Sequence, residues 1–218
     1  MSPRSAAGVL CLVAASAGAE PQAAAGPTLS LVWYDPSNVA RGTELVARKE
    51  AADLLARLGA NVSWRNGAPG EVTRSGEVWV ILVDSGPQQP SGTLVLGATR
   101  ARRESSRVLW VRVPNVAAAV GAPSRPVRLL PPEGLRAVGV ALGRVVAHEV
   151  VHVLAPSLPH SSGLMAGSLT RGQLTAPLIA VGHEATLAVR AALRGEPAFT
   201  PPAAAMMAQA PRLMEKDY

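Results

Sequence analysis

The sequence predicts one domain of the mixed α/β (α+β) class, in which helices pack on a twisted mixed sheet. Short apolar runs bounded by Gly, Pro, Asn and Asp alternate with longer amphipathic runs along the chain. The segment 77–83 is almost wholly apolar, which is typical of a strand in the middle of a sheet. With 218 residues, the chain is long enough for one ordinary domain with its own core.

The first half of the chain is predicted to form strands around one helix. Thr28 to Tyr34 alternates well enough for a strand and is ended by Asp35-Pro36. The stretch 41–58 has an apolar stripe opposite a charged face, and Gly59 follows as a natural helix stop. Further strands are expected at 62–65, 77–83, 94–98 and 107–113.

The second half is predicted to be mainly helical. A proline-rich linker follows a short helix and leads into a long apolar helix, which Pro156 closes. A turn and a last helix, stopped by Gly195, complete the fold. The predicted helices and turn lie at 115–121, 137–154, 170–174 and 179–193.

Residues 1–19 have the parts of a secretory signal peptide. Arg4 supplies a basic start, a short apolar run follows, and Ala17-Gly18-Ala19 is an Ala-x-Ala cleavage site. The run is too short and too rich in Ala and Gly for a membrane span. We expect no later stretch to be long and apolar enough either, and hence no stable membrane insertion. The expected location is secreted or periplasmic in a bacterium.

The mature chain is expected to hold a domain at 27–198 and a flexible tail at 199–218, which mixes Pro, Ala and Met with few charges. The single cysteine, Cys11, falls inside the signal, so neither a disulfide nor a thiolate metal ligand is expected. The net charge of +6 favours acidic partners. The arginines are mostly scattered without interleaved aromatic residues, so nucleic-acid binding is not expected.

The strongest chemical signal is His148-Glu149-Val150-Val151-His152, on the long apolar helix. Histidines four residues apart lie on one helix face and can reach one metal ion, while the glutamate can reach a metal-bound water as general base. A catalytic zinc site needs three protein ligands. His160 follows after a short loop that can bring it back to the same point, so the residues favour a zinc-dependent hydrolase.

These residues resemble the metzincin metalloproteases, whose pattern is His-Glu-x-x-His-x-x-Gly-x-x-His followed by a methionine turn. The run 142–165 is similar to small exported bacterial proteins of metzincin type. The resemblance implies His148, His152 and His160 as zinc ligands and Glu149 as the general base. It also implies a metzincin-like fold, with Met165 in a Met-turn as a hydrophobic floor under the metal and a C-terminal helix after it.

The chain departs from the metzincin pattern in the loop after the motif. Ala155 stands where glycine is expected, Leu158 stands where the third histidine is expected, and His160 comes two residues late. A rival third ligand is therefore Glu184, as in thermolysin-like enzymes with two histidines and a later glutamate. His183 beside it is a weaker candidate.

The expected function is that of a zinc metalloendopeptidase, with Zn²⁺ as cofactor and a protein or peptide as substrate. Glu149 would assist a zinc-bound water in hydrolysing a peptide bond. The alternative is an exported zinc-binding protein whose metallopeptidase site is degenerate or non-catalytic. The oligomeric state and the cleavage specificity do not follow from the sequence.

Overall fold

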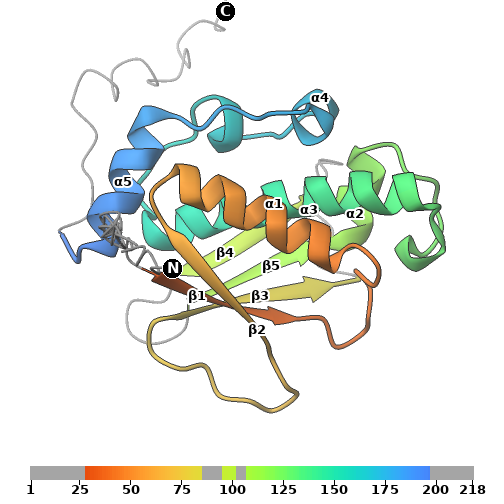
Figure 1. Cartoon of the computed structure of the whole chain (residues 1–218), viewed down its shortest axis with the longest axis horizontal. Helices are drawn as coiled ribbons and strands as arrows, with labels where there is room; N and C mark the ends of the chain where they lie inside the picture. Colours follow the sequence, from red (N-terminus) through yellow and green to blue (C-terminus); the bar gives the residue numbers. More distant parts are fainter. Residues whose placement is uncertain (1–27, 85–94, 102–106, 197–218) are drawn as a thin grey trace, which may run out of the picture.

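The core of the protein is a five-stranded mixed sheet in the order β2-β1-β3-β5-β4 (Figure 1). The first four strands in that order are mutually parallel, and β4 pairs antiparallel with β5 at one edge. The computed structural model describes residues 28–84, 95–101 and 107–196. The strands are β1 (Thr28–Tyr34), β2 (Asn61–Asn66), β3 (Glu77–Val83), β4 (Gly97–Ala101) and β5 (Arg107–Arg112).

The helices complete a mixed α/β fold, as predicted. In Figure 1 the long helix α3 runs beside α1, with strands below it in the view, α4 above it and α5 at the left. The predicted strands at 28–34 and 77–83 match the structure to the residue, and the apolar 77–83 is the central strand. The helices are α1 (Glu44–Arg57), α2 (Val113–Ala119), α3 (Pro132–Leu154), α4 (Arg171–Thr175) and α5 (His183–Leu193), with short 3₁₀ turns η1 (Val127–Leu129) and η2 (Gly163–Met165).

Close contact between α1 and α3 depends on two glycines one turn apart on α3. A Cβ on Gly143 would lie 2.6 Å from the carbonyl oxygen of Ala47, and one on Gly139 would lie 2.8 Å from Cβ of Val46. Neither position can hold a larger side chain without moving α1, because a contact this short is repulsive. The small residues therefore set the depth at which α3 lies in the core.

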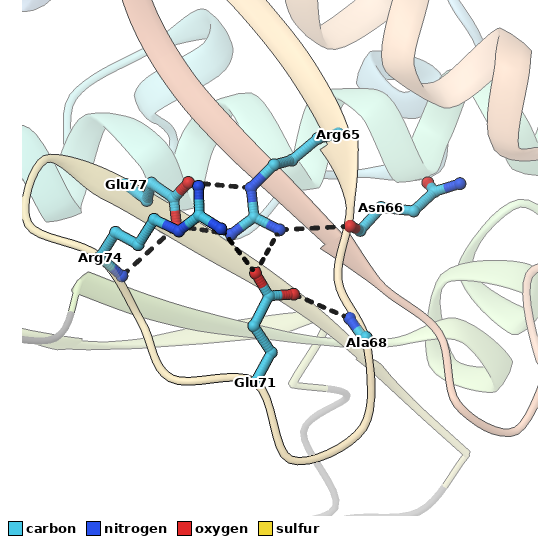
Figure 2. A network of polar contacts seen from close by, with 6 residues as sticks. All are labelled: Arg65, Asn66, Ala68, Glu71, Arg74 and Glu77. Atoms are coloured by element: carbon cyan, nitrogen blue, oxygen red, sulfur yellow. Dashed lines mark hydrogen bonds and ion pairs between the residues drawn. The ribbon is translucent and has the colours of Figure 1, made fainter.

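The β2–β3 connection covers part of the opposite face of the sheet. Val32 and Trp79 are buried there, beside Gly67. Arg65 lies 5.7 Å from the Trp79 ring centroid and binds both carboxylate oxygens of Glu77, at 2.8 and 2.6 Å (Figure 2). This hydrogen bonding lowers the pKa of Glu77.

Glu71 in the same connection joins the network. It lies 2.8 Å from Arg65 Nη1 and accepts a 3.0 Å hydrogen bond from the backbone N–H of Ala68 (Figure 2). The pair Arg65 and Glu77 joins β2 to β3 across the intervening β1. The network therefore braces the loop that covers Trp79.

Several predicted boundaries were wrong by a few residues. The first helix begins at Glu44 rather than at 41, because Gly42 has φ +90°, which is outside the helical range, and Asp35 accepts hydrogen bonds from two backbone N–H groups of the preceding turn. The strand predicted at 94–98 is paired over 97–101, and the last helix begins at 183 after an extended approach.

The short helix predicted at 115–121 lies at 113–119, and the turn at 170–174 is the capped helix α4. The predicted signal peptide at 1–19 and tail at 199–218 lie outside the described residues. The expectation that no later stretch could span a membrane was wrong by length and composition, because α3 meets both criteria. Its apolar window is 83 % buried inside the protein, as expected of a core helix.

Candidate metal centre

Helix α3 carries the predicted motif into the interior of the molecule. His148 is 8 % exposed and Glu149 is 7 % exposed, while His152 is half-buried. The two histidines lie one turn apart, and their ring centroids are 4.7 Å apart. The helix is long and packed on several sides, so it holds these side chains on a rigid element.

The orientation of His148 is set by the backbone of η2. Nδ1 of His148 lies 2.7 Å from the carbonyl oxygen of Leu164. A carbonyl can only accept, so Nδ1 carries the proton and donates it. The lone pair of the neutral ring is therefore on Nε2, where it is free to bind a metal. A backbone carbonyl on the distal nitrogen is the usual partner of a metal-binding histidine.

His160 reaches the same point from the loop after α3. Its Nε2 lies 3.1 Å from Nε2 of His152, and its ring stacks on His148 with centroids 5.5 Å apart. One ring nitrogen from each of the three histidines lies within 4.8 Å of the other two. The structure therefore brings His148, His152 and His160 close enough together to hold a metal ion.

The two extra residues in the loop have a clear structural outcome. Leu158, where the metzincin pattern has its third histidine, is buried at 4 % exposure. A turn closed by a 3.0 Å hydrogen bond from Leu158 N–H to the Ala155 carbonyl carries the chain past it. The ring of His160 then lies beside Gly167, where a Cβ would be 3.5 Å away.

The segment after His160 is fastened to its surroundings. Met165 is fully buried, and its carbonyl accepts a 2.8 Å hydrogen bond from Ser161 N–H. Leu164 N–H donates to the carbonyl of Ala180 at 2.8 Å. Met165 is the last residue of the 3₁₀ turn η2. The rival residues Glu184 and His183 lie in the first turn of α5, outside the three-histidine group.

Burial favours the neutral forms of the central side chains. It lowers the pKa of His148, and it lowers that of His152 to about 4, with further lowering by the neighbouring histidines. Burial raises the pKa of Glu149 to about 7. Neutral imidazoles are the form that binds metals, and a nearby cation would favour the ionised carboxylate of Glu149.

Gly97, the first residue of β4, makes room for Glu149. A Cβ at this position would lie 2.8 Å from both Cγ and Oε1 of Glu149. The sequence analysis missed this residue. The available signal was a glycine inside a predicted strand, which often marks a close approach of another group to the backbone.

Arg144 was also missed, although a lone arginine in the apolar run 137–147 is a signal of a buried polar contact. It is 1 % exposed and donates to Glu50 at 2.8 Å and to the carbonyls of Gln173 and Ala176. The side chain of Gln173 in turn donates to the carbonyl of Gly163 at 3.3 Å. Arg144 therefore links α1 and α3 to the segment that orients His148.

The three histidines open onto a cavity of about 950 Å³. Its walls are the stretch 95–99 at the start of β4, the motif face of α3, and residues from 156–160 and 166–171. The volume is in the range of sites that take small molecules or a short stretch of peptide. Among the described lining residues, Glu149 and Arg171 are the only side chains besides the histidines that carry a titratable or permanent charge.

No protein-family model, no curated protein and no solved structure matches this chain. The centre therefore has to be interpreted from its own residues and their geometry.

Proposed function

We propose that the protein is a zinc-dependent metalloendopeptidase. The observation that carries this proposal is the convergence of three imidazoles next to a buried carboxylate at the wall of a cavity. Three protein ligands with room for a further group are the arrangement of catalytic zinc sites, whereas structural zinc sites have four protein ligands.

The donor set fits zinc. Two nitrogens bound to one tetrahedral zinc at 2.0–2.1 Å lie about 3.3 Å apart. The 3.1 Å between the Nε2 atoms of His152 and His160 is close to this value. Imidazole ligands also suit copper, iron and nickel, so the metal must be identified by measurement. The proposed ligands are His148, His152 and His160.

Zinc, when bound, acts as a Lewis acid toward water and the substrate carbonyl. Glu149 accepts the proton of the attacking water and then returns it to the leaving amine, as its pKa near neutrality allows. The missing side chain at Gly97 leaves the space that the carboxyl group of Glu149 occupies at the cavity wall. Leu164 preserves the tautomer of His148 through the hydrogen bond to Nδ1.

An extended peptide is a suitable substrate because of the edge strand. β4 is the last strand in the order of the described sheet, and its first residues line the cavity. The edge that does not face β5 can accept backbone hydrogen bonds from a peptide that adds as a further strand. Such binding recognises the main chain and suits cleavage within a protein segment.

The test is metal content measured together with peptide cleavage. The full chain and Glu149→Gln are expected to bind about one zinc each. His148→Ala and His152→Ala should lose it. Wild type should cleave a denatured protein, and Glu149→Gln should not. Glu184→Gln is the matched carboxylate-to-amide control and should keep both properties.

Two results would contradict the proposal. Equal cleavage by wild type and Glu149→Gln would remove the glutamate from the chemistry. Stoichiometric zinc in wild type without cleavage of any peptide would favour a zinc-binding protein with no catalysis. Loss of zinc in Glu184→Ala but not in His160→Ala would instead move the third ligand to α5.

A further inference from the structure

Arg171 places a positive charge in the wall of the cavity. It is the first residue of α4, and its side chain extends to the end of α2. A Cβ at Gly121 would lie 2.9 Å from Cζ and 3.0 and 3.1 Å from the two Nη atoms of Arg171. These nearly equal distances mean that one face of the guanidinium lies on the bare backbone of Gly121. Arg171 is an exposed residue, so its guanidinium stays in contact with solvent, and the contact with Gly121 limits the positions that it can take at the cavity wall.

The charge of Arg171 is not balanced within the described part of the chain. Its guanidinium has no ion pair or hydrogen bond there, in contrast to the buried Arg144, which is paired with Glu50. The one acid among the described cavity-lining residues is Glu149, whose carboxyl group packs against Gly97. A divalent cation on the three histidines would increase the positive potential further.

We infer that the cavity binds a substrate carboxylate and that Arg171 is the residue that recognises it. A carboxylate offers two oxygens in the geometry of the guanidinium fork, and a partly enclosed cavity strengthens the attraction. The carboxylate can come from an acidic side chain near the scissile bond or from the free carboxyl terminus of a short peptide. This substrate class rests on the proposed peptidase function.

The test uses matched peptides that differ in one charge. In the first set, the two peptides of each pair differ only by Glu or Gln at one position flanking the cleaved bond. In the second set, they differ only by a free or an amidated carboxyl terminus. Equilibrium binding is measured by fluorescence anisotropy on zinc-loaded Glu149→Gln, and kcat/KM is measured on wild type. The acidic member is expected to be favoured about tenfold in both.

Variants of Arg171 assign the preference to this residue. Arg171→Gln should bring the acid-to-amide ratio close to unity, and Arg171→Glu should favour peptides with a basic residue instead. Arg57→Gln removes an exposed charge from α1, outside the cavity lining, and should keep the wild-type ratio. Melting curves of the variants confirm that each is folded.

Each outcome has a distinct meaning. A preference in the side-chain pair or in the terminal pair supports the inference and identifies the source of the carboxylate. Equal binding and cleavage of acid and amide, or a preference that persists in Arg171→Gln, overturns it while leaving the peptidase proposal intact. Arg171-dependent binding without any cleavage supports carboxylate recognition and contradicts the peptidase. Neither binding nor cleavage of any peptide overturns both.

Discussion

Replacing Arg144 with methionine should destabilise the protein and weaken its metal centre together. The substitution keeps most of the side-chain volume but removes the charge and all three hydrogen bonds. Glu50 loses its ion pair, at 2.8 Å, and the carbonyls of Gln173 and Ala176 lose their donor. The side chain is 1 % exposed, so water cannot easily replace it.

The cost can be estimated from these contacts. Breaking a buried ion pair costs about 3–5 kcal/mol, and an unsatisfied buried carbonyl costs about 1 kcal/mol or more. The side chain of Glu50 is 23 % exposed and its charge is partly hydrated in the variant, which reduces the cost. We therefore expect about 3 kcal/mol in total. In a domain of this size that lowers Tm by about 6–12 °C.

The effect on the metal follows from the chain of contacts toward His148. Arg144 holds Gln173, whose side chain binds Gly163, the neighbour of the carbonyl that orients His148. Loss of such an outer contact typically weakens metal binding by about tenfold or more. Zinc affinity is measured by competition with a chelator, at a temperature where the variant is folded.

Two comparisons make the reasoning refutable. Arg194 pairs with Glu196 on the surface, so Arg194→Met should cost less than about 0.5 kcal/mol. Adding Glu50→Gln to Arg144→Met should recover part of the stability, because the unpaired carboxylate is gone. If Arg144→Met melts like Arg194→Met, the energetic argument is wrong. Unchanged zinc affinity would refute the link to His148.

Three further predictions concern the site itself. Gly97→Ala should lower kcat/KM by about 100-fold with zinc retained, because the added Cβ displaces Glu149. Gly182→Ala is the control and should keep the wild-type rate, because a Cβ there meets nothing within 4 Å. Equal rates for the two variants would contradict the contact between residue 97 and Glu149. Metal-free Glu149→Gln should lose stability in denaturant titrations as the pH falls from 6.5 through about 4, since the lowered pKa of His152 lets the unfolded state take up the proton first. The Glu149→Gln background is used because the raised pKa of the Glu149 carboxyl group contributes stability of the opposite sign, which is lost as the pH rises through about 7. Adding His152→Gln should flatten the slope of stability against pH. A slope that this second change leaves unaffected would rule out His152 as its source. Free zinc at about 100 times its Kd should stabilise the wild type by about 2.7 kcal/mol over the metal-free form, and a Tm that does not respond to zinc would argue against a site formed only in the folded state.

Local patterns were sufficient to predict most of the architecture. The all-apolar 77–83 indicated the central strand, and the amphipathic and apolar runs indicated α1 and α3, because the burial of a regular element has the period of that element. The boundary errors fall where single backbone angles or pairing partners decide, as at Gly42 and at the start of β4.

The spacing of His148, Glu149 and His152 on a helix was sufficient, by itself, to determine that two imidazoles and a carboxylate share one neighbourhood. Only the tertiary structure brought His160 to the same point. Leu158, at the sequence position where the metzincin pattern has its third histidine, is buried instead. The tertiary structure also decided that the Leu164 carbonyl orients His148. The reason is physical: helix geometry is repeated at every turn, whereas the path of a loop depends on contacts between residues far apart in the chain, which leave no period in the sequence.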